Sequence, residues 1–149
     1  MTLNRSTELV GTLFRVVVGV LFGLHGAATI FGLFGGVMGS GQPAPVGTWP
    51  AWWAGVIQLV GGLLVVLGLG TRVSALICSG SMAYAYFVVH QPLGLLPMQN
   101  GGELAALFCW SFLLIAALGP GRLALDHALT RRSRVATPAA PEREPALTR

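Results

Sequence analysis

Long apolar runs separated by short glycine-rich or polar segments dominate the chain. From Val16 to Thr71 there is no Asp, Glu, Lys or Arg, and the same holds from Val73 to Gly102. A soluble domain needs charged side chains on its solvent-facing surfaces, so runs of this length indicate helices that lie in lipid or against one another. The pattern predicts four membrane-spanning helices, at about residues 9–34, 51–69, 72–90 and 100–118.

Helix-breaking and capping residues mark the ends of these predicted helices. Residues 35–50 are rich in Gly and Pro and cannot form a continuous helix, and Pro92 stops the third helix. Thr71 is a predicted N-cap of the third helix. Asn100 and Glu103 have the spacing of a capping box, which predicts the start of the fourth helix at Asn100.

Both ends of the chain are polar. Residues 1–8 form a short lead on what we expect to be the cytoplasmic side. After a Gly-Pro-Gly breaker, the alternation of Leu with polar residues at 122–129 predicts a short interfacial helix. Residues 130–149 are rich in Arg and Pro and poor in large apolar residues, which predicts a disordered cytoplasmic tail. Residues 9–129 are therefore the predicted membrane domain.

Composition supports a membrane protein and argues against a nucleic-acid-binding protein. Of the 149 residues, 54% are hydrophobic and 9% are charged, whereas roughly a quarter of the residues of a soluble protein are charged. The net charge is +4, but the arginines do not form a basic stripe interleaved with aromatic residues, as a nucleic-acid groove requires. We therefore expect this chain to associate with the lipid bilayer and not with nucleic acid.

The positions of the arginines predict the orientation. With four spans, Arg5, Arg15, Arg72 and Arg122 all fall on one side, and the first and third loops contain no Lys or Arg. The positive-inside rule then places both termini in the cytoplasm. Arg15 lies inside the first helix, where its head group is expected to snorkel to the interface. Pairing of Arg15 with a cytoplasmic acid such as Asp126 is the alternative.

Small residues predict where helices approach closely. Gly19 and Gly23 lie on one face of the first helix, and Ala75, Ser79 and Ala83 recur at helical spacing in the third. In membranes, helices associate through van der Waals packing at such faces. We therefore expect these residues at helix–helix contacts.

Polar side chains from all four helices are predicted to lie in the same half of the bundle. At a rise of ~1.5 Å per residue, their expected depths coincide in the outer half of the membrane. Unpaired polar groups in a membrane cost several kcal/mol, so we expect them to point inward and form a pocket. The candidate ligand-binding residues are His25, Gln58, Tyr86, His90 and Glu103.

Each candidate also has a structural explanation. Glu103 would complete the capping box, and His90 would be a solvated histidine at a helix end. His25 and Gln58 would form hydrogen bonds between helices, and Tyr86 would be a core aromatic residue. Two histidines and a carboxylate are also a set of metal ligands, but their spacing contains no local metal motif, so no metal site is predicted.

Several short motifs carry a family resemblance. In the first half they are Arg15 with His25-Gly26, then Gln58, Gly61-Gly62-Leu63-Leu64 and Gly68-Leu69-Gly70-Thr71-Arg72; in the second half they are His90-Gln91-Pro92, Asn100-Gly101-Gly102-Glu103 and Gly119-Pro120-Gly121-Arg122 with Leu125-Asp126. Over about residues 9–129 the chain resembles the DoxX family of small bacterial membrane proteins. It departs from the family pattern at Gln58, where many relatives are expected to have Glu, and at Ala124, where many are expected to have Ser.

The resemblance implies an all-α membrane protein, a four-helix transmembrane bundle in the bacterial plasma membrane. It also implies association with subunits of thiosulfate:quinone oxidoreductases and with membrane complexes that couple thiol chemistry to oxidative defence. An amide at Gln58 cannot take up a proton but can still form hydrogen bonds. The departure at this position therefore weakens a role in proton transfer there.

Two functions follow from these expectations. In the first, the chain is a redox-associated subunit whose pocket binds a quinone or a similar small molecule, with His and Glu hydrogen-bonded to ring oxygens and exchanging protons. In the second, it is a non-enzymatic accessory subunit that stabilises a larger membrane complex, or a homo-oligomer, through its small-residue faces. A transporter is a weaker third hypothesis, because four helices would need oligomerisation to enclose a pathway.

Overall fold

The structure is a computed structural model that describes residues 5–121 and 123–127. Within these ranges it contains helices and no strand, which agrees with the predicted all-α class. The predicted tail at 130–149 lies outside the described residues. Of the predicted interfacial segment 122–129, residues 123–127 are described and include a helical turn at 125–127.

The described residues form four long α-helices and one short one, together with three 3-10 turns and the π-helical segment Ala85–His90. The long helices are α1 (Arg5–Phe31), α2 (Ala51–Leu67), α3 (Thr71–Tyr84) and α5 (Glu103–Leu118), and the short helix is α4 (Pro97–Asn100). Two stretches in the described part of the chain, α1 and Thr71–Leu93, are long and apolar enough to cross a membrane. The apolar helices α2 and α5 are shorter, with 17 and 16 residues.

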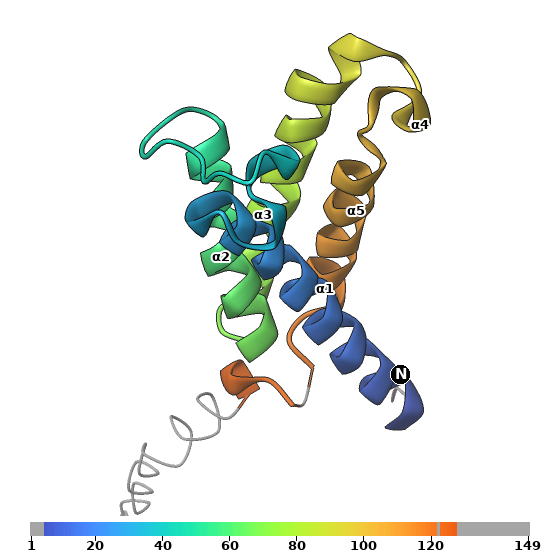
Figure 1. Ribbon diagram of the computed structural model, residues 1–149. Coiled ribbons are helices and arrows are strands. Elements are labelled where there is room, and N and C mark those ends of the chain that lie inside the picture. The colour runs from blue at the N-terminus through green and yellow to red at the C-terminus, as the bar shows by residue number, and fades with distance from the viewer. Residues whose placement is uncertain (1–4, 122, 128–149) are drawn as a thin grey trace, which may run out of the picture.

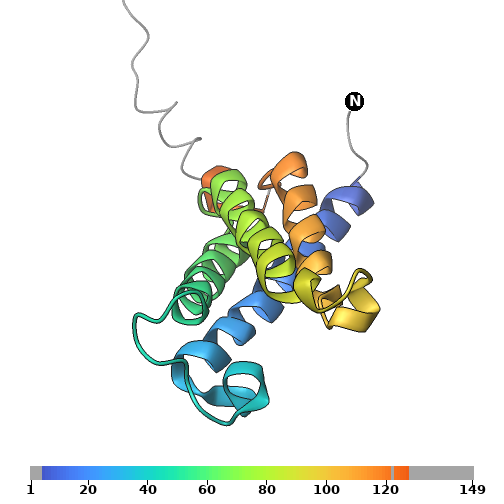
Figure 2. The same ribbon diagram turned by 90° about the horizontal axis from the view of Figure 1, so that it is seen from above.

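The helices run between two ends that differ in composition (Figure 1). The start of α1, the α2–α3 turn and residues 123–127 lie at the lower end in Figure 1, and we call this the arginine end, because Arg5 and Arg72 are there. The segment between α1 and α2 and the short helix α4 lie at the opposite end, which we call the loop end. Figure 2 shows that α1 crosses the other long helices obliquely.

Several helix ends differ from the sequence predictions. The first turn of α1 begins at Arg5, inside the expected polar lead, and α1 ends at Phe31 because Gly32 adopts a left-handed conformation with φ 71°. The prediction that Asn100 and Glu103 form a capping box is wrong. The last long helix begins at Glu103, and Asn100 Oδ1 instead accepts a hydrogen bond from the Gly102 N–H at 2.7 Å.

The long helices form two closely packed pairs, α1 with α2 and α3 with α5. Glycines allow the close approach of α1 and α2. A Cβ atom at Gly19 would lie 3.0 Å from the Gly62 carbonyl oxygen, and one at Gly26 would lie 2.8 Å from the Leu59 Cα. Gly23 differs from these two, because a Cβ atom there would meet no other atom within 4 Å. Gly19 and Gly26 therefore belong to the internal contact, whereas Gly23 is open.

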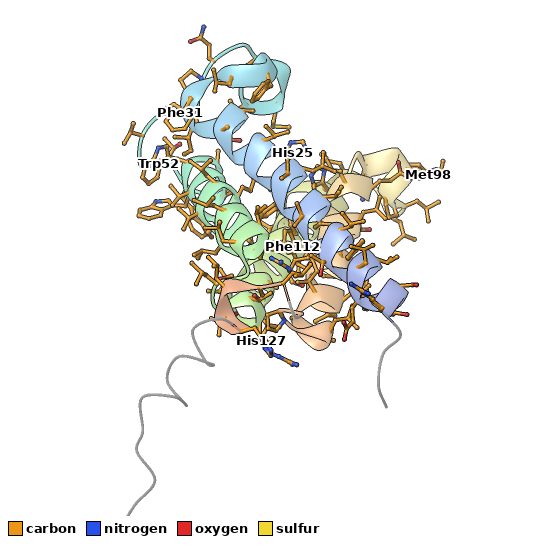
Figure 3. All side chains as sticks on the ribbon, turned by 90° about the horizontal axis from the view of Figure 1, so that it is seen from below. His25, Phe31, Trp52, Met98, Phe112 and His127 are labelled. Carbon is orange, nitrogen blue, oxygen red and sulfur yellow. The ribbon has the colours of Figure 1, made fainter. Side chains whose placement is uncertain are left out.

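Aromatic and small residues fill the centre of the structure. Phe22 of α1 and Phe112 of α5 are fully buried, and their ring centroids lie 4.5 Å apart in an edge-to-face contact. Phe112 lies in the middle of the assembly in Figure 3. Ala75 is buried in the same core. Ser79 Oγ donates a hydrogen bond to the Cys109 carbonyl oxygen at 2.9 Å, which links α3 to α5.

The row of small residues on α3 is not buried evenly. Ala75 and Ser79 are buried, whereas Ala83, one turn farther along, is only half-buried. Ala83 is the last member of the row before α3 gives way to the π-helical segment Ala85–His90. The closest packing of α3 is thus in its first three turns.

Gly26→Ala should destabilise the fold, because the new methyl group would overlap the α2 backbone at Leu59. Overpacking of this kind costs about 1–3 kcal/mol. Gly23→Ala is the matched control on the same helix, because its methyl group meets open space and Ala favours the helix by roughly 1 kcal/mol over Gly. Thermal unfolding of the purified protein in detergent should show a lower midpoint for Gly26→Ala only. Equal midpoints for the two variants would contradict the close contact at Gly26.

Candidate functional site

A groove of about 550 Å³ lies between the two helix pairs at the loop end. Its walls come from α2 and from α3 with the π-helical segment that follows, and residues of the 33–50 segment cover one side. The walls are almost wholly apolar. The residues that the argument uses are Met38, Trp49, Trp53, Ile57, Gln58, Ile77, Ser81 and Tyr84.

Few polar groups line this groove. The side-chain oxygen of Gln58, Oε1, is buried and has no hydrogen-bond partner among the described residues. Trp49 Nε1 donates a hydrogen bond to the Tyr84 hydroxyl at 3.1 Å, and the two rings meet nearly edge-to-face at 5.5 Å. A buried amide without a partner is costly in apolar surroundings. A ligand atom that bonded Gln58 would remove that cost.

The π-helical segment Ala85–His90 lies against the start of α5. A Cβ atom at Gly102 would lie 2.8 Å from Tyr86 Cδ2 and 2.9 Å from His90 Cβ, so only glycine fits between them. His90 Nδ1 lies 3.1 Å from the Asn100 carbonyl oxygen, which accepts its hydrogen bond. π-Helical turns often occur at functional sites. Here the turn brings Tyr86 and His90 next to Gly102, the residue that precedes α5.

The other two predicted site residues are exposed. Glu103 makes no hydrogen bond with the described residues, and its side chain is exposed at the loop end. His25 is exposed on α1, where its ring lies edge-on to Phe108 at 5.8 Å. Figure 3 shows His25 on the side of α1 away from Trp52. Neither residue lines the groove.

The five predicted ligand-binding residues therefore do not line one cavity. Gln58 alone among them lines the groove, while Tyr86, His90 and Glu103 gather at the start of α5, and His25 lies on the α1–α5 face. Sequence reasoning missed the groove residues Ser81 and Trp49. It also missed Tyr84, because a Tyr–Trp contact 35 positions apart leaves no local pattern.

A second polar assembly lies at the arginine end. Arg15 is 3% exposed, and its Nη1 donates hydrogen bonds to the carbonyl oxygens of Val65 and Val66, the latter at 2.8 Å. These carbonyls belong to the last turn of α2, where helical N–H partners run out, although the Val65 carbonyl also accepts a bond from the Gly68 N–H at 3.2 Å. The expected snorkelling of Arg15 to the interface is therefore wrong, because the guanidinium satisfies the end of α2 instead.

Asp126 caps the start of α3 from a distant part of the chain. Its Oδ1 accepts a hydrogen bond from the Gly70 N–H at 2.8 Å, and its Oδ2 accepts bonds from the Thr71 N–H and hydroxyl, both at 3.0 Å. The N-cap position is Gly70, so the prediction of Thr71 as N-cap is wrong. Arg15 and Asp126 also interact electrostatically, as the sequence alternative proposed.

The environment of Asp126 favours its ionised form. Partial burial alone would raise the pKa of this carboxyl group. The hydrogen bonds from Thr71 and Gly70, together with the positive charge of Arg15, outweigh that effect and lower the pKa of Asp126 below its ordinary value of 3.8. The carboxylate is therefore charged at neutral pH, which is the state that caps α3.

Comparison with known proteins supports the family resemblance in the part of the chain that ends at His90-Gln91. The sequence profile of the DoxX family matches residues 11–91. The chain belongs to the DoxX family. This DoxX protein is 43% identical over 120 residues to an uncharacterized protein of Haemophilus influenzae, covering 76% of this chain and 85% of the relative. No solved structure matches it.

A second relative carries a named activity. The DoxX protein is 28% identical over 124 residues to a Bacillus subtilis protein named "Putative oxidoreductase CatD", covering 83% of this chain and 90% of the relative. Family membership and the two long apolar stretches make this chain a membrane protein.

Asp126→Asn should destabilise the DoxX protein at neutral pH, because an amide keeps only one of the two acceptor oxygens that bond Gly70 and Thr71 and carries no charge. The loss of a hydrogen bond to a charged group costs about 1.5–3 kcal/mol. The stabilisation by Asp126 is present above the unfolded-state pKa, roughly pH 4, and is lost as the pH falls through the lowered pKa of the folded state. Thermal unfolding in detergent at several pH values should show that the difference between the wild type and Asp126→Asn closes in acid.

Glu103→Gln is the control, because it removes the same charge from an exposed side chain that makes no hydrogen bond with the described residues. It should change the unfolding midpoint less than Asp126→Asn at every pH. A constant difference between the wild type and Asp126→Asn down to strongly acid pH would argue against the charged cap.

Proposed function

We propose that this DoxX protein is a redox-associated membrane subunit that binds a quinone, or a similar small ring molecule, in the groove between α2 and α3. The observation that carries this proposal is the buried, unpartnered oxygen of Gln58 beside an apolar cavity. Ligand sites are commonly apolar clefts of roughly 300–1,000 Å³ with a few polar groups that fix orientation. A cavity of about 550 Å³ lies within that range.

The chemistry of the lining residues fits a quinone in either redox state. An amide carries both donors and an acceptor, so Gln58 would donate to a quinone carbonyl or accept from a quinol hydroxyl. The Tyr84 hydroxyl and Ser81 lie on the opposite wall. Electron transfer is a property of the bound quinone itself, and in this proposal the electron donor is a partner subunit.

The site differs from the pocket expected from the sequence in its proton chemistry. No Asp, Glu or His lines the groove among the described residues. This proposal therefore gives Gln58, Ser81 and Tyr84 a role in binding and orientation, without proton transfer. His25, His90 and Glu103 have no contact with the ligand in it.

The relative from Bacillus subtilis favours a redox role. Its name describes an oxidoreductase, and it aligns with most of both chains. At 28% identity this relationship supports a general class of chemistry. The choice of a ring molecule as ligand rests on the groove, and the choice of a partner subunit rests on the family resemblance.

A second candidate function is that of a non-enzymatic accessory subunit of a larger complex. Gly23 favours it, because this glycine of α1 faces open space where another helix could approach. Gly19 does not contribute, since α2 already covers it. In this alternative a bulky substitution at Gly23 would weaken a partner complex and leave bound quinone unchanged.

The membrane placement in this proposal has four spans with both termini in the cytoplasm. The arginine end holds Arg5, Arg15 and Arg72, so the positive-inside rule assigns it to the cytoplasm of the bacterial plasma membrane. Helices of 17 and 16 residues are about 25 Å long, a few ångströms less than a hydrocarbon core of about 30 Å. Exposed Trp49 and Trp53 extend the apolar surface of α2 toward the loop end.

Gln58→Leu should lower the quinone that co-purifies with the protein from native membranes about five- to tenfold, because one buried hydrogen bond to the ring is lost. Mild-detergent purification, followed by solvent extraction and mass spectrometry of bound quinone per chain, measures this. His25→Phe and Glu103→Gln are controls outside the groove and should retain wild-type quinone. Loss of quinone in the controls but not in Gln58→Leu would contradict the proposed site.

Labelling of introduced cysteines should test the orientation. A membrane-impermeant maleimide should label Ser40→Cys in intact cells, and it should label Ser6→Cys only after the membrane is opened. The wild-type chain is the background control, because Cys78 is buried and Cys109 is half-buried. Labelling of Ser6→Cys but not Ser40→Cys in intact cells would reverse the proposed orientation.

A further inference from the structure

The contact between α2 and α3 has a second hollow on the arginine-end side of the groove. This second cavity of about 190 Å³ lies beside the groove, and the two share Ile57 and Ile77 as lining residues. The second cavity is also lined by Val60, Leu64 and Ser74, which places it nearer the α2–α3 turn. We call this second cavity the seam. An apolar cavity of roughly 150 Å³ is enough to hold benzene, so the seam has room for part of a hydrocarbon chain.

The close packing of α2 on α3 limits the width of the seam. A Cβ atom at Gly61 would collide with the sulfur of Cys78, so α2 and α3 touch here through glycine. The seam is therefore narrow at one side and open at the other, where Val60 is 51% exposed. A flexible chain fits such a shape better than a ring does.

The lack of charged lining residues argues against an ionic head group in the groove. No Asp, Glu, Lys, Arg or His lines the groove or the seam among the described residues. The residues with polar side-chain groups that line the groove are all neutral, namely Thr29, Trp49, Gln58, Ser81 and Tyr84. A phosphate or carboxylate there would lack a counter-charge in apolar surroundings, which is strongly unfavourable. The groove is thus suited to a neutral polar head.

From these observations we infer that the site takes a lipophile with a neutral ring head and a hydrocarbon tail, the head against Gln58 and Tyr84 and the tail in the seam past Ile57 and Ile77. This inference rests on the proposed function and makes its ligand specific. The tail runs from the loop end toward the middle of the helices. A tailless quinone or a charged lipid would fill only part of the site.

The seam holds the tail through shape complementarity, because a hydrocarbon tail gains no hydrophobic free energy when it moves from lipid into protein. Its contribution is van der Waals contact with Val60, Leu64 and Ile77. Tail position, and not affinity alone, is therefore the property to measure. Photochemical crosslinking reports position directly.

The test uses the full chain in lipid nanodiscs and two benzoquinones with decyl tails, one with a diazirine on the ring and one with it near the end of the tail. Crosslinks are assigned to single residues by fragmentation of the labelled peptides. The ring probe should label Gln58 or Tyr84, and the tail probe should label Val60, Leu64 or Ser74. A fatty acid with the same tail diazirine should label the seam about tenfold less, because its carboxylate stays at the interface.

Val60→Trp should fill the open side of the seam and lower tail labelling at Ser74 several-fold, with ring labelling at Gln58 retained. Leu63→Trp is the matched control, since Leu63 is exposed on the same helix but lines neither cavity. Ring labelling in the groove with tail labelling spread over all lipid-facing helices would overturn the tail position and leave the proposed function intact. Absence of ring labelling from the groove would overturn both.

Discussion

The buried guanidinium of Arg15 holds the arginine end of the structure together. It donates hydrogen bonds to two carbonyl oxygens in the last turn of α2, in the region where α2 turns into α3. Asp126 then caps α3 through Gly70 and Thr71 and adds an opposite charge near Arg15. A buried arginine is strongly unfavourable without such partners. The α2–α3 turn is thus fixed by residues from α1 and from the segment after α5.

This fixed turn joins the two helix pairs. Packing within each pair is close, whereas packing between the pairs leaves cavities. Glycine contacts bring α1 and α2 together, and a serine hydrogen bond with small residues links α3 to α5. The helices α2 and α3 touch at Gly61 and Cys78, and space remains between the pairs on either side of that contact. The groove follows from the way the pairs are joined, and its loop end is covered by Trp49 bonded to Tyr84.

The helical class and the general extent of the long helices follow from the sequence because charge-free runs leave few alternatives. The ends do not, since they depend on tertiary contacts such as the carboxylate of Asp126 at Gly70. The candidate site was harder to predict because depth along a helix does not give rotation about its axis. His25 and Gln58 have similar predicted depths, yet one is exposed beside Phe108 and the other lines the groove.

The connection of the two pairs through the α2–α3 turn has a mechanical consequence. If the pairs rotate relative to each other, the clamped turn at Gly68–Thr71 is the hinge, and the loop end is the far end of the lever. Over a helix about 25 Å long, a rotation of about 5° would change the separation at the far end by about 2 Å. A small change in the strain on the turn would therefore alter the width of the groove mouth by more than the length of a carbon–carbon bond.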